Sequence, residues 1–277
     1  MLANLSDLLI PAAEQKYAVG HFNVTSWTMA RGVVKAAEEL DAPVILGIEE
    51  RQLVSCPLDE FASFAVNLAE KASVPVALHF DHGYTFETCI EALDWGFTSI
   101  NYDCSKDSFE ENVSKVANMA RIAHAFGASL EAELGYTPEA SELAAGGAKS
   151  YYTVPEQAAD YVRATGIDAL AISVGTAQGT YTVRPRIDYK RIEAIASAVP
   201  IPLVLHGGSG LSDRTIRHAI SSGISKIDIF TDPDLRGGQG CIQAINDGVT
   251  GLTGILPYAE FSVKVTAQEK IRLFQNA

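Results

Sequence analysis

The 277-residue sequence lacks the features that mark several protein classes. Lysine and arginine are not clustered and the net charge is −13, which disfavours nucleic acid and membrane as partners, since both attract basic surfaces. No apolar run approaches the ~18 residues of a membrane span, and no basic segment of a signal peptide precedes the first apolar stretch. The four cysteines have no CxxC or CxxxC spacing, which argues against a sulfur-bound metal. We therefore expect a cytoplasmic protein with reduced thiols.

Short β-rich apolar runs alternate with longer amphipathic segments along the whole chain. Eight runs are predicted to be strands: Tyr17–Phe22, Val44–Gly47, Val76–Leu78, Ser99–Tyr102, Ser129–Glu133, Ala169–Ser173, Leu203–Leu205 and Lys226–Ile229. Seven helices are predicted between and after them: Trp27–Leu40, Leu58–Ala72, Phe86–Trp95, Phe109–Phe126, Glu156–Ala164, Tyr189–Ala198 and Asp213–Ser222. Repeated strand–helix units predict parallel strands that are buried on both faces. Eight of them, in a chain near the ~250 residues typical of the fold, favour an α/β class protein with a closed (β/α)₈ TIM barrel.

The domain organisation is read from the absence of any linker or change of composition. Residues 1–277 are expected to form a single barrel domain, and no GxGxxG motif follows the first strand to favour a dinucleotide-binding sheet. Residues 134–154 are longer than a typical connection, so we expect an active-site loop, with a surface insertion as the alternative. Residues 255–277 are expected to be a helical extension, which either contributes to a subunit contact or packs on its own barrel. We expect a homodimer or homotetramer.

Polar residues gather immediately after the predicted strands, where a TIM barrel places its catalytic residues. Two histidines among them, His82 and His206, follow separate strands beside acidic residues, a pattern typical of metal ligation, whereas an isolated histidine is more often structural. The segment His206–Gly210 follows the seventh strand and Thr231 follows the eighth. Barrels often bind phosphate at these two loops, through backbone amides and a helix N-terminus. A plain tight turn is the alternative explanation of the glycines.

Six motifs together carry a family resemblance: LHFDHG (78–83), NYDCS (101–105), EAELG (131–135), GTAQGTY (175–181), LVLHGGSGLSD (203–213) and KIDIFTD (226–232). They closely resemble the class II, metal-dependent ketose-bisphosphate aldolases, and the tagatose-bisphosphate aldolase-like branch in particular. The resemblance extends from AVGHFNV (18–24) to the last predicted helix. It implies a lyase of carbohydrate metabolism that reversibly cleaves a phosphorylated or otherwise anionic ketose through a zinc-stabilised enediolate.

The resemblance also implies a role for each matching position. Asp81 would be the catalytic acid/base, and Glu142 would be the catalytic glutamate of the loop, with Glu139 as the alternative. The expected zinc ligands are His82 and His206, with Asp103 and Glu133 beside the metal. Substrate and phosphate binding would fall to Asn23, Gly179, Gly207, Gly208, Ser209, Asp228 and Thr231. A monovalent cation, Na⁺ or K⁺, would be bound by carbonyl groups near Ala177, Gly179 and Gly207.

The expected metal site departs from the family pattern at one ligand. The family reads GTxHG where this chain reads GTAQG, so Gln178 replaces the third zinc histidine. Zinc sites of this type hold three protein ligands and an open position, and an amide oxygen is a weaker donor than imidazole. Gln178 itself, Glu133 or Asp103 could complete the shell.

Three further departures face the same site. Asp228 stands where the family has an asparagine that contacts the phosphorylated half of the substrate, and an ionised carboxylate there would repel phosphate. Pro138-Glu139 replaces a Gly-Gly pair in the loop, and Glu49–Arg51 lacks a small, hydroxyl-bearing pattern. Together they support an alternative hypothesis: a degenerate barrel that binds a sugar phosphate, or a non-catalytic aldolase subunit. A barrel that performs another metal-assisted reaction is a third possibility.

Overall fold

Eight parallel strands close into a barrel in the computed structural model, which describes residues 1–145 and 151–276. The strands are β2 (Val19–Asn23), β3 (Val44–Glu49), β4 (Val76–Gly83), β5 (Ser99–Tyr102), β6 (Ser129–Leu134), β7 (Ala169–Ile172), β8 (Leu203–Leu205) and β9 (Ile224–Ile229). Each pairs with the next along the chain, and β9 pairs with β2 to complete the ring. The predicted TIM barrel is confirmed.

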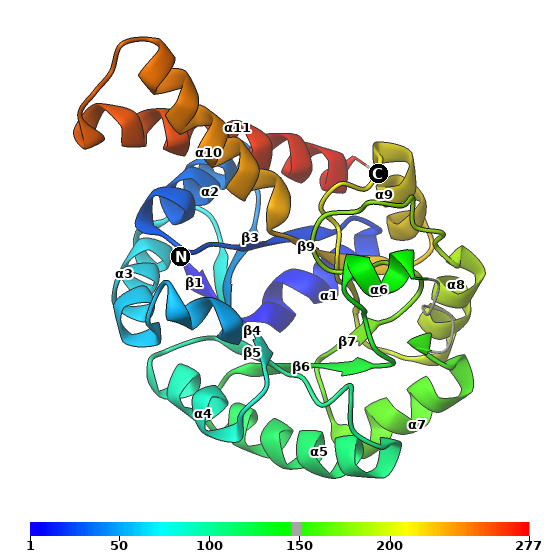
Figure 1. Cartoon of the computed structure of the whole chain (residues 1–277). Coiled ribbons are helices and arrows are strands. Elements are labelled where there is room, and N and C mark those ends of the chain that lie inside the picture. The colour runs from blue at the N-terminus through cyan, green and yellow to red at the C-terminus, as the bar shows by residue number, and fades with distance from the viewer. Residues whose placement is uncertain (146–150, 277) are drawn as a thin grey trace.

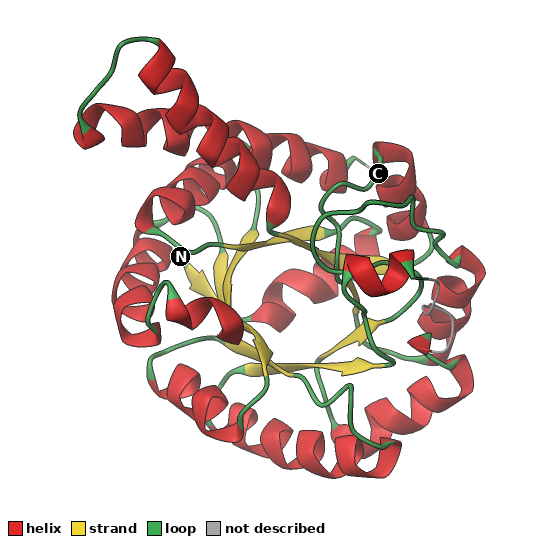
Figure 2. Ribbon diagram, viewed as in Figure 1, coloured by secondary structure: helices red, strands yellow, loops and turns green. Residues whose placement is uncertain are grey.

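Helices form the outer layer around the ring of strands (Figure 2). They are α2 (Trp27–Glu39), α3 (Leu58–Lys71), α4 (Phe86–Asp94), α5 (Phe109–Ala125), α7 (Pro155–Thr165), α8 (Tyr189–Ala198), α9 (Asp213–Ser221) and, after the last strand, α10 (Thr231–Asn246) and α11 (Leu252–Gln275). Two short helices lie in the connections, namely η1 (Glu50–Val54) and α6 (Ala140–Ala144). Ser212 caps the start of α9, where its side chain accepts a hydrogen bond from the Thr215 amide.

Two N-terminal elements were missed by the sequence analysis, namely β1 (Leu2–Ala3) and α1 (Leu5–Gln15). Helix α1 lies in the middle of the ring when the molecule is viewed along the barrel (Figure 1). Its apolar side chains recur at helical spacing, and they pack in one cluster with apolar side chains of β2, β3, β4, β7 and β8. The members from α1 are Leu5, Leu8, Leu9 and Ala12. The helix therefore closes the amino-terminal end of the barrel, opposite the strand ends where the site was expected.

A charged layer fills the barrel interior above this apolar cluster. Lys226 is completely buried, and its Nζ lies 2.9 Å from Glu131 Oε2 and 3.0 Å from Asp228 Oδ1. His21 fits beside them because residue 47 is glycine: a Cβ at Gly47 would lie 2.0 Å from His21 Nε2. The ion cluster separates the apolar end of the barrel from the polar mouth.

The last two helices, α10 and α11, form a hairpin whose tip projects away from the barrel (Figure 1). Helix α11 begins at Leu252, three residues before the predicted extension, and ends at Gln275. It is attached to α2 by ion pairs, including Lys264 Nζ to Glu39 Oε1 at 2.7 Å.

The α1 closure generates a prediction about stability. Leu9 is 1% exposed, whereas its neighbour Ile10 on the same helix is 51% exposed. Leu9→Ala should lower the free energy of unfolding by about 2–5 kcal/mol, because it opens a cavity between α1 and the barrel. Ile10→Ala is the matched control and should change stability by about 0.5 kcal/mol or less. Urea unfolding followed by circular dichroism measures both, and equal effects would show that α1 is not part of the core.

Candidate active site

A cavity of about 240 Å³ opens at the carboxyl ends of the strands. It is lined by most of the residues that the sequence analysis selected: Asn23, Asp81, His82, Gln178, Gly179, His206, Gly207, Ser209, Asp228 and Thr231. Five further residues line it, namely Glu49, Arg51, Glu139, Ile229 and Phe230. Of the selected residues, Asp103, Glu133, Gly208 and Glu142 are not on its wall. The structure therefore brings most of the expected site together around one space.

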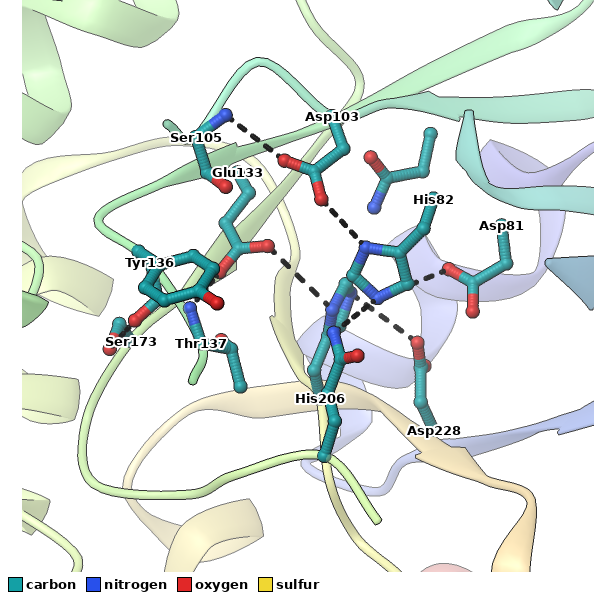
Figure 3. A network of polar contacts seen from close by, with 12 residues as sticks. Asp81, His82, Asp103, Ser105, Glu133, Tyr136, Thr137, Ser173, His206 and Asp228 are labelled. Carbon is teal, nitrogen blue, oxygen red and sulfur yellow. Dashed lines mark hydrogen bonds and ion pairs between the residues drawn. The ribbon is translucent and has the colours of Figure 1, made fainter. Parts of the chain in front are cut away.

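His82 lies at an irregular end of β4. The pairing register with β5 shifts between Phe80 and Gly83, and His82 has a positive φ of 43°, which is uncommon for a side-chain-bearing residue. Its Nδ1 lies 2.9 Å from Asp103 Oδ2, and Asp103 also accepts a hydrogen bond from the Ser105 amide (Figure 3). This bond fixes the ring and leaves Nε2 directed into the cavity. A carboxylate behind the imidazole is the usual support of a histidine that binds a metal.

His206 is supported in the same way from the opposite side. Its Nε2 lies 3.0 Å from Glu131 Oε1, and its Nδ1 is buried without a hydrogen-bond partner among the described residues. The two imidazole rings are edge to face, with centroids 4.5 Å apart. Asp81 Oδ1 lies 4.0 Å from His82 Nε2 and is likewise without a partner among the residues described. Ligand atoms of Asp81, His82 and His206 all lie within 4.8 Å of one another, so this cluster could hold a metal ion.

The electrostatics of the cluster also favour a cation. Five buried or nearly buried carboxylates lie in and around the cluster, and the Lys226 ammonium pairs with the last two of them: Asp81, Asp103, Glu133, Glu131 and Asp228. Burial, together with the Asp103 carboxylate, raises the pKa of Glu133 to about 7. Burial alone would lower the pKa of His206, but Asp228 and the other carboxylates raise it to about 9. Without the protons on Glu133 and His206, the site carries surplus negative charge. A divalent metal ion that displaced these protons would balance that charge. The donor set fits a metal.

Gln178, which replaces the third histidine, is held by Arg51. Gln178 Oε1 accepts a hydrogen bond from Arg51 Nη2 at 2.7 Å, and Gln178 Nε2 lies 3.0 Å from His82 Nε2. The amide oxygen, which is the atom able to bind a metal, therefore faces away from the histidines. Glu133 is better placed to act as a ligand, because its Oε2 lies 3.9 Å from His206 Nδ1.

Asp228, the second departure, is surrounded by Lys226 and two histidines. Its carboxylate lies 3.0 Å from Lys226 Nζ, 3.1 Å from His21 Nδ1 and 3.3 Å from His206 Nε2. The Lys226 ammonium and the two histidines overcome the effect of burial and hold its pKa well below the ordinary value. An anion in the cavity would therefore face a carboxylate that is already paired. The sequence analysis missed His21, because a histidine inside an apolar strand gives no signal of its long-range partner.

One end of the cavity has the elements of an anion site. Helix α10 begins at Thr231, so its positive end faces the cavity, and Ser209 Oγ accepts a hydrogen bond from the Phe230 amide at 3.1 Å. Gly207 has φ 72°, and a Cβ there would lie 2.1 Å from the Ala177 carbonyl oxygen. Only glycine therefore permits this approach of the two loops. Gly208 has a structural role, since its amide donates to the Asp228 carbonyl at 2.9 Å.

The loop after β6 contacts the site through Glu139. Its backbone flanks that of residue 178: the Gln178 amide donates to the Pro138 carbonyl and the Ala140 amide donates to the Gln178 carbonyl, both at 2.8 Å. Glu142 does not line the cavity; its Oε2 accepts hydrogen bonds from Tyr136 Oη and the Glu139 amide. Its catalytic role stays a prediction. Residues 146–150 of the predicted loop, including Gly146 and Gly147, lie outside the described residues.

A closed (β/α)₈ barrel with paired histidines, a free carboxylate and an anion site at its carboxyl end defines a metal-assisted enzyme class. The comparison with protein families agrees with this class and specifies it. The family model described as "Fructose-bisphosphate aldolase class-II" matches residues 3–277. The chain belongs to the class II fructose-bisphosphate aldolase family, and it is an aldolase, a lyase, as the motifs implied.

Individual relatives cover nearly the whole chain. The protein YdjI of Escherichia coli K12 is 38% identical over 84% of each chain, and the crystal structure of the YdjI aldolase has a TM-score of 0.89 over 99% of this chain and 97% of that one. A Staphylococcus epidermidis fructose-bisphosphate aldolase is 35% identical over 99% of this chain and 97% of its own length. The Campylobacter jejuni enzyme, at 22% identity, has a TM-score of 0.82 over 99% of this chain and 95% of its own, which supports the fold.

The site geometry predicts which histidines bind the metal. His82→Ala and His206→Ala should each weaken zinc binding by more than ~10–100-fold, because even the loss of a supporting residue costs that much. The exposed His124 and His218 provide matched controls, and their alanine variants should bind zinc as the unmodified protein does. Elemental analysis after dialysis against a graded chelator measures the affinity. Full zinc retention by either site variant would contradict the assignment.

Proposed function

We propose that this aldolase cleaves a phosphorylated ketose by using zinc held by His82, His206 and Glu133, with Asp81 as the acid/base. The observation that carries the proposal is that two histidines are each tied by one nitrogen to a carboxylate and share a cavity with a free carboxylate oxygen. When bound, zinc would polarise the ketose carbonyl and stabilise the negative charge that develops as the carbon–carbon bond breaks.

The proton transfer is assigned to Asp81. Its Oδ2 accepts a hydrogen bond from Asn23 Nδ2 at 2.7 Å, which fixes the carboxylate and leaves Oδ1 free to meet the substrate. In the cleavage direction, Oδ1 takes the proton of the hydroxyl group that becomes the aldehyde. The electron pair of the broken bond remains on the ketone fragment, which takes up a proton from water at the same carbon, and Asp81 then releases its own proton to solvent. In the reverse direction Asp81 returns its proton to the new hydroxyl group.

The phosphate of the substrate is assigned to the anion site. The loop glycines Gly179 and Gly207, the Ser209 hydroxyl and the first turn of α10 at Thr231 supply donors that do not depend on the net charge of the chain. Tyr181 Oη donates to the Gly207 carbonyl at 2.8 Å and accepts from the Ala177 amide at 2.9 Å. The monovalent cation is assigned to the same pair of loops. There the Gly207 carbonyl oxygen would bind the ion in place of the Tyr181 hydroxyl group.

The departures at Gln178 and Asp228 support an adapted site over a degenerate one. Each is matched by partners elsewhere in the chain: Arg51 for Gln178, and His21 with Lys226 for Asp228. Such matched partners are not expected in a site that has lost its function. We also assign the protein to the cytoplasm, and its four unpaired cysteines fit a reducing compartment.

The acid/base assignment gives a second activity test. Asp81→Asn should lower the rate of ketose cleavage by ~10²–10⁴-fold, the usual contribution of a general acid–base group. Zinc content and melting temperature should stay close to those of the unmodified protein, because Asn preserves the bond with Asn23. Asp94→Asn removes the same charge at an exposed position of α4 and should leave turnover unchanged. A variant at position 81 with more than about a tenth of the original rate would assign the proton to another group.

The subunit assembly is assigned to the hairpin of α10 and α11, as a homodimer or homotetramer. Exposed apolar side chains gather on it: Leu235, Ile242, Ile245, Leu252, Leu256 and Phe261. Their exposed fractions run from 41% to 69%, and apolar surface of this extent is typical of contacts between subunits. A second copy of the same chain provides a matching apolar surface through a twofold axis.

This assembly is tested by placing charge on the hairpin. Ile242→Glu with Phe261→Glu should convert the oligomer to monomers, because a buried unpaired carboxylate opposes association. Val54→Glu is the control, since Val54 is 90% exposed and lies on η1, away from the hairpin. Light scattering after size-exclusion chromatography measures the mass. A double variant with the mass of the unmodified oligomer would place the contact elsewhere.

A further inference from the structure

Three positions at which the sequence departs from the class II aldolase pattern meet in one hydrogen-bonded cluster. Arg51 follows β3, Glu139 follows β6 and Gln178 follows β7, so they come from three distant segments. Arg51 Nη1 donates to Glu139 Oε1 at 2.9 Å, and Arg51 Nη2 donates to Gln178 Oε1 at 2.7 Å. Arg51 Nε also pairs with Glu49, and all four side chains line the cavity. Their convergence indicates that they act as one unit.

The backbone of Gln178 is fixed independently of its side chain. Its amide and carbonyl groups both bond to the segment Pro138–Ala140, at 2.8 Å each. The side chain therefore starts from a defined point on the cavity wall. The contact that orients the Gln178 amide group determines whether its oxygen or its nitrogen faces the histidines.

Arg51 decides the orientation of the Gln178 amide. A guanidinium group has donors and no acceptor, so the carbonyl end of the amide must face Arg51. The opposite orientation would set the Gln178 NH₂ group against the Arg51 donors, without an acceptor between them. As a result the NH₂ group faces the cavity, 3.0 Å from His82 Nε2. An amide nitrogen has no lone pair to offer a metal, whereas its two N–H groups are good donors.

We infer that Gln178 is a substrate-binding hydrogen-bond donor instead of a metal ligand, and that Arg51 is the positioning residue that orients it. This inference rests on the proposed function. With a metal on His82 Nε2, the Gln178 NH₂ group loses that acceptor and donates to an oxygen of the bound ketose. The residues that would hold the metal are then His82, His206 and a carboxylate. An imidazole ligand of the family has been exchanged for a neutral donor directed at the substrate.

Zinc titration of purified protein tests the ligand question without turnover. Gln178→Ala should keep the zinc affinity within about threefold, whereas loss of a true ligand costs at least ~10-fold. Gln178→His should gain little by itself, because the Arg51 cation lies beside the new imidazole. Gln178→His combined with Arg51→Met should bind zinc at least tenfold more tightly than Gln178→His alone. Equal affinities for these two variants, or a tenfold loss in Gln178→Ala, would overturn the inference.

Binding of dihydroxyacetone phosphate, a ketone phosphate, to the zinc-loaded protein tests the donor. Gln178→Ala should weaken this binding by about tenfold, the range of a lost hydrogen bond in a closed site. Arg51→Met should weaken it to a similar extent, and the double variant should be no worse than Gln178→Ala, because the two residues act in series. The exposed Arg163 and Gln157 provide matched controls, as Arg163→Met and Gln157→Ala. Unchanged binding in Gln178→Ala, or additive losses in the double variant, would refute the assignment.

The same measurements separate this inference from the proposed function. The proposed aldol cleavage is tested by turnover. It is refuted if the zinc-loaded protein binds the ketone phosphate but cleaves no ketose phosphate. The inferred role of Gln178 would stand in that case, because it is tested by the affinities for zinc and for the ketone phosphate. Conversely, a protein that cleaves ketose phosphates but loses zinc in Gln178→Ala would keep the function and refute the role of Gln178.

Discussion

The buried ammonium group of Lys226 is the interaction on which the site depends. It lies completely buried in the barrel between Glu131 and Asp228, and each of these carboxylates also contacts His206. A lone charge at this depth would cost several kcal/mol or more, so the three groups are stable only together. The position of His206, and with it one half of the metal cluster, is therefore set by an ion cluster in which Asp228 lines the cavity wall and Lys226 is completely buried. Replacement of one member changes the charge balance of all the others.

The two ends of the barrel differ in composition and in role. At the amino-terminal end, α1 and apolar strand residues form a closed core that excludes water and supplies stability. At the carboxyl end, the same strands continue into carboxylates and histidines whose mutual repulsion is relieved only by protons or a cation. The charged layer with Lys226, Glu131 and Asp228 lies between the two. The apolar packing of α1 at one end, and of the outer helices around the strands, supports a barrel whose other end holds groups that by themselves destabilise a fold.

The sequence predicted the barrel well because its evidence is local. All eight predicted strands and seven helices are present, with bounds that differ by a few residues, and β4 runs five residues further than predicted, into the site itself. The N-terminal β1 and α1 were missed, since a two-residue strand has no pattern and Pro11 breaks the appearance of a helix. The position of the site followed from the strand ends. The partners of its unusual residues did not, because Arg51 with Gln178 and His21 with Asp228 are pairs between distant segments, and no local pattern reports them.

Helix α10 connects the cavity at the barrel mouth with the projecting hairpin. Its first residue, Thr231, forms part of the anion site, and its far end carries Ile242 and Ile245 on the projecting hairpin. A helix of 16 residues is about 24 Å long and resists bending. In the proposed assembly, this helix would link the subunit contact at one end to the proposed phosphate site at the other. A change in how two subunits pack would then shift the Thr231 end of the helix, and with it the donors proposed to bind the phosphate.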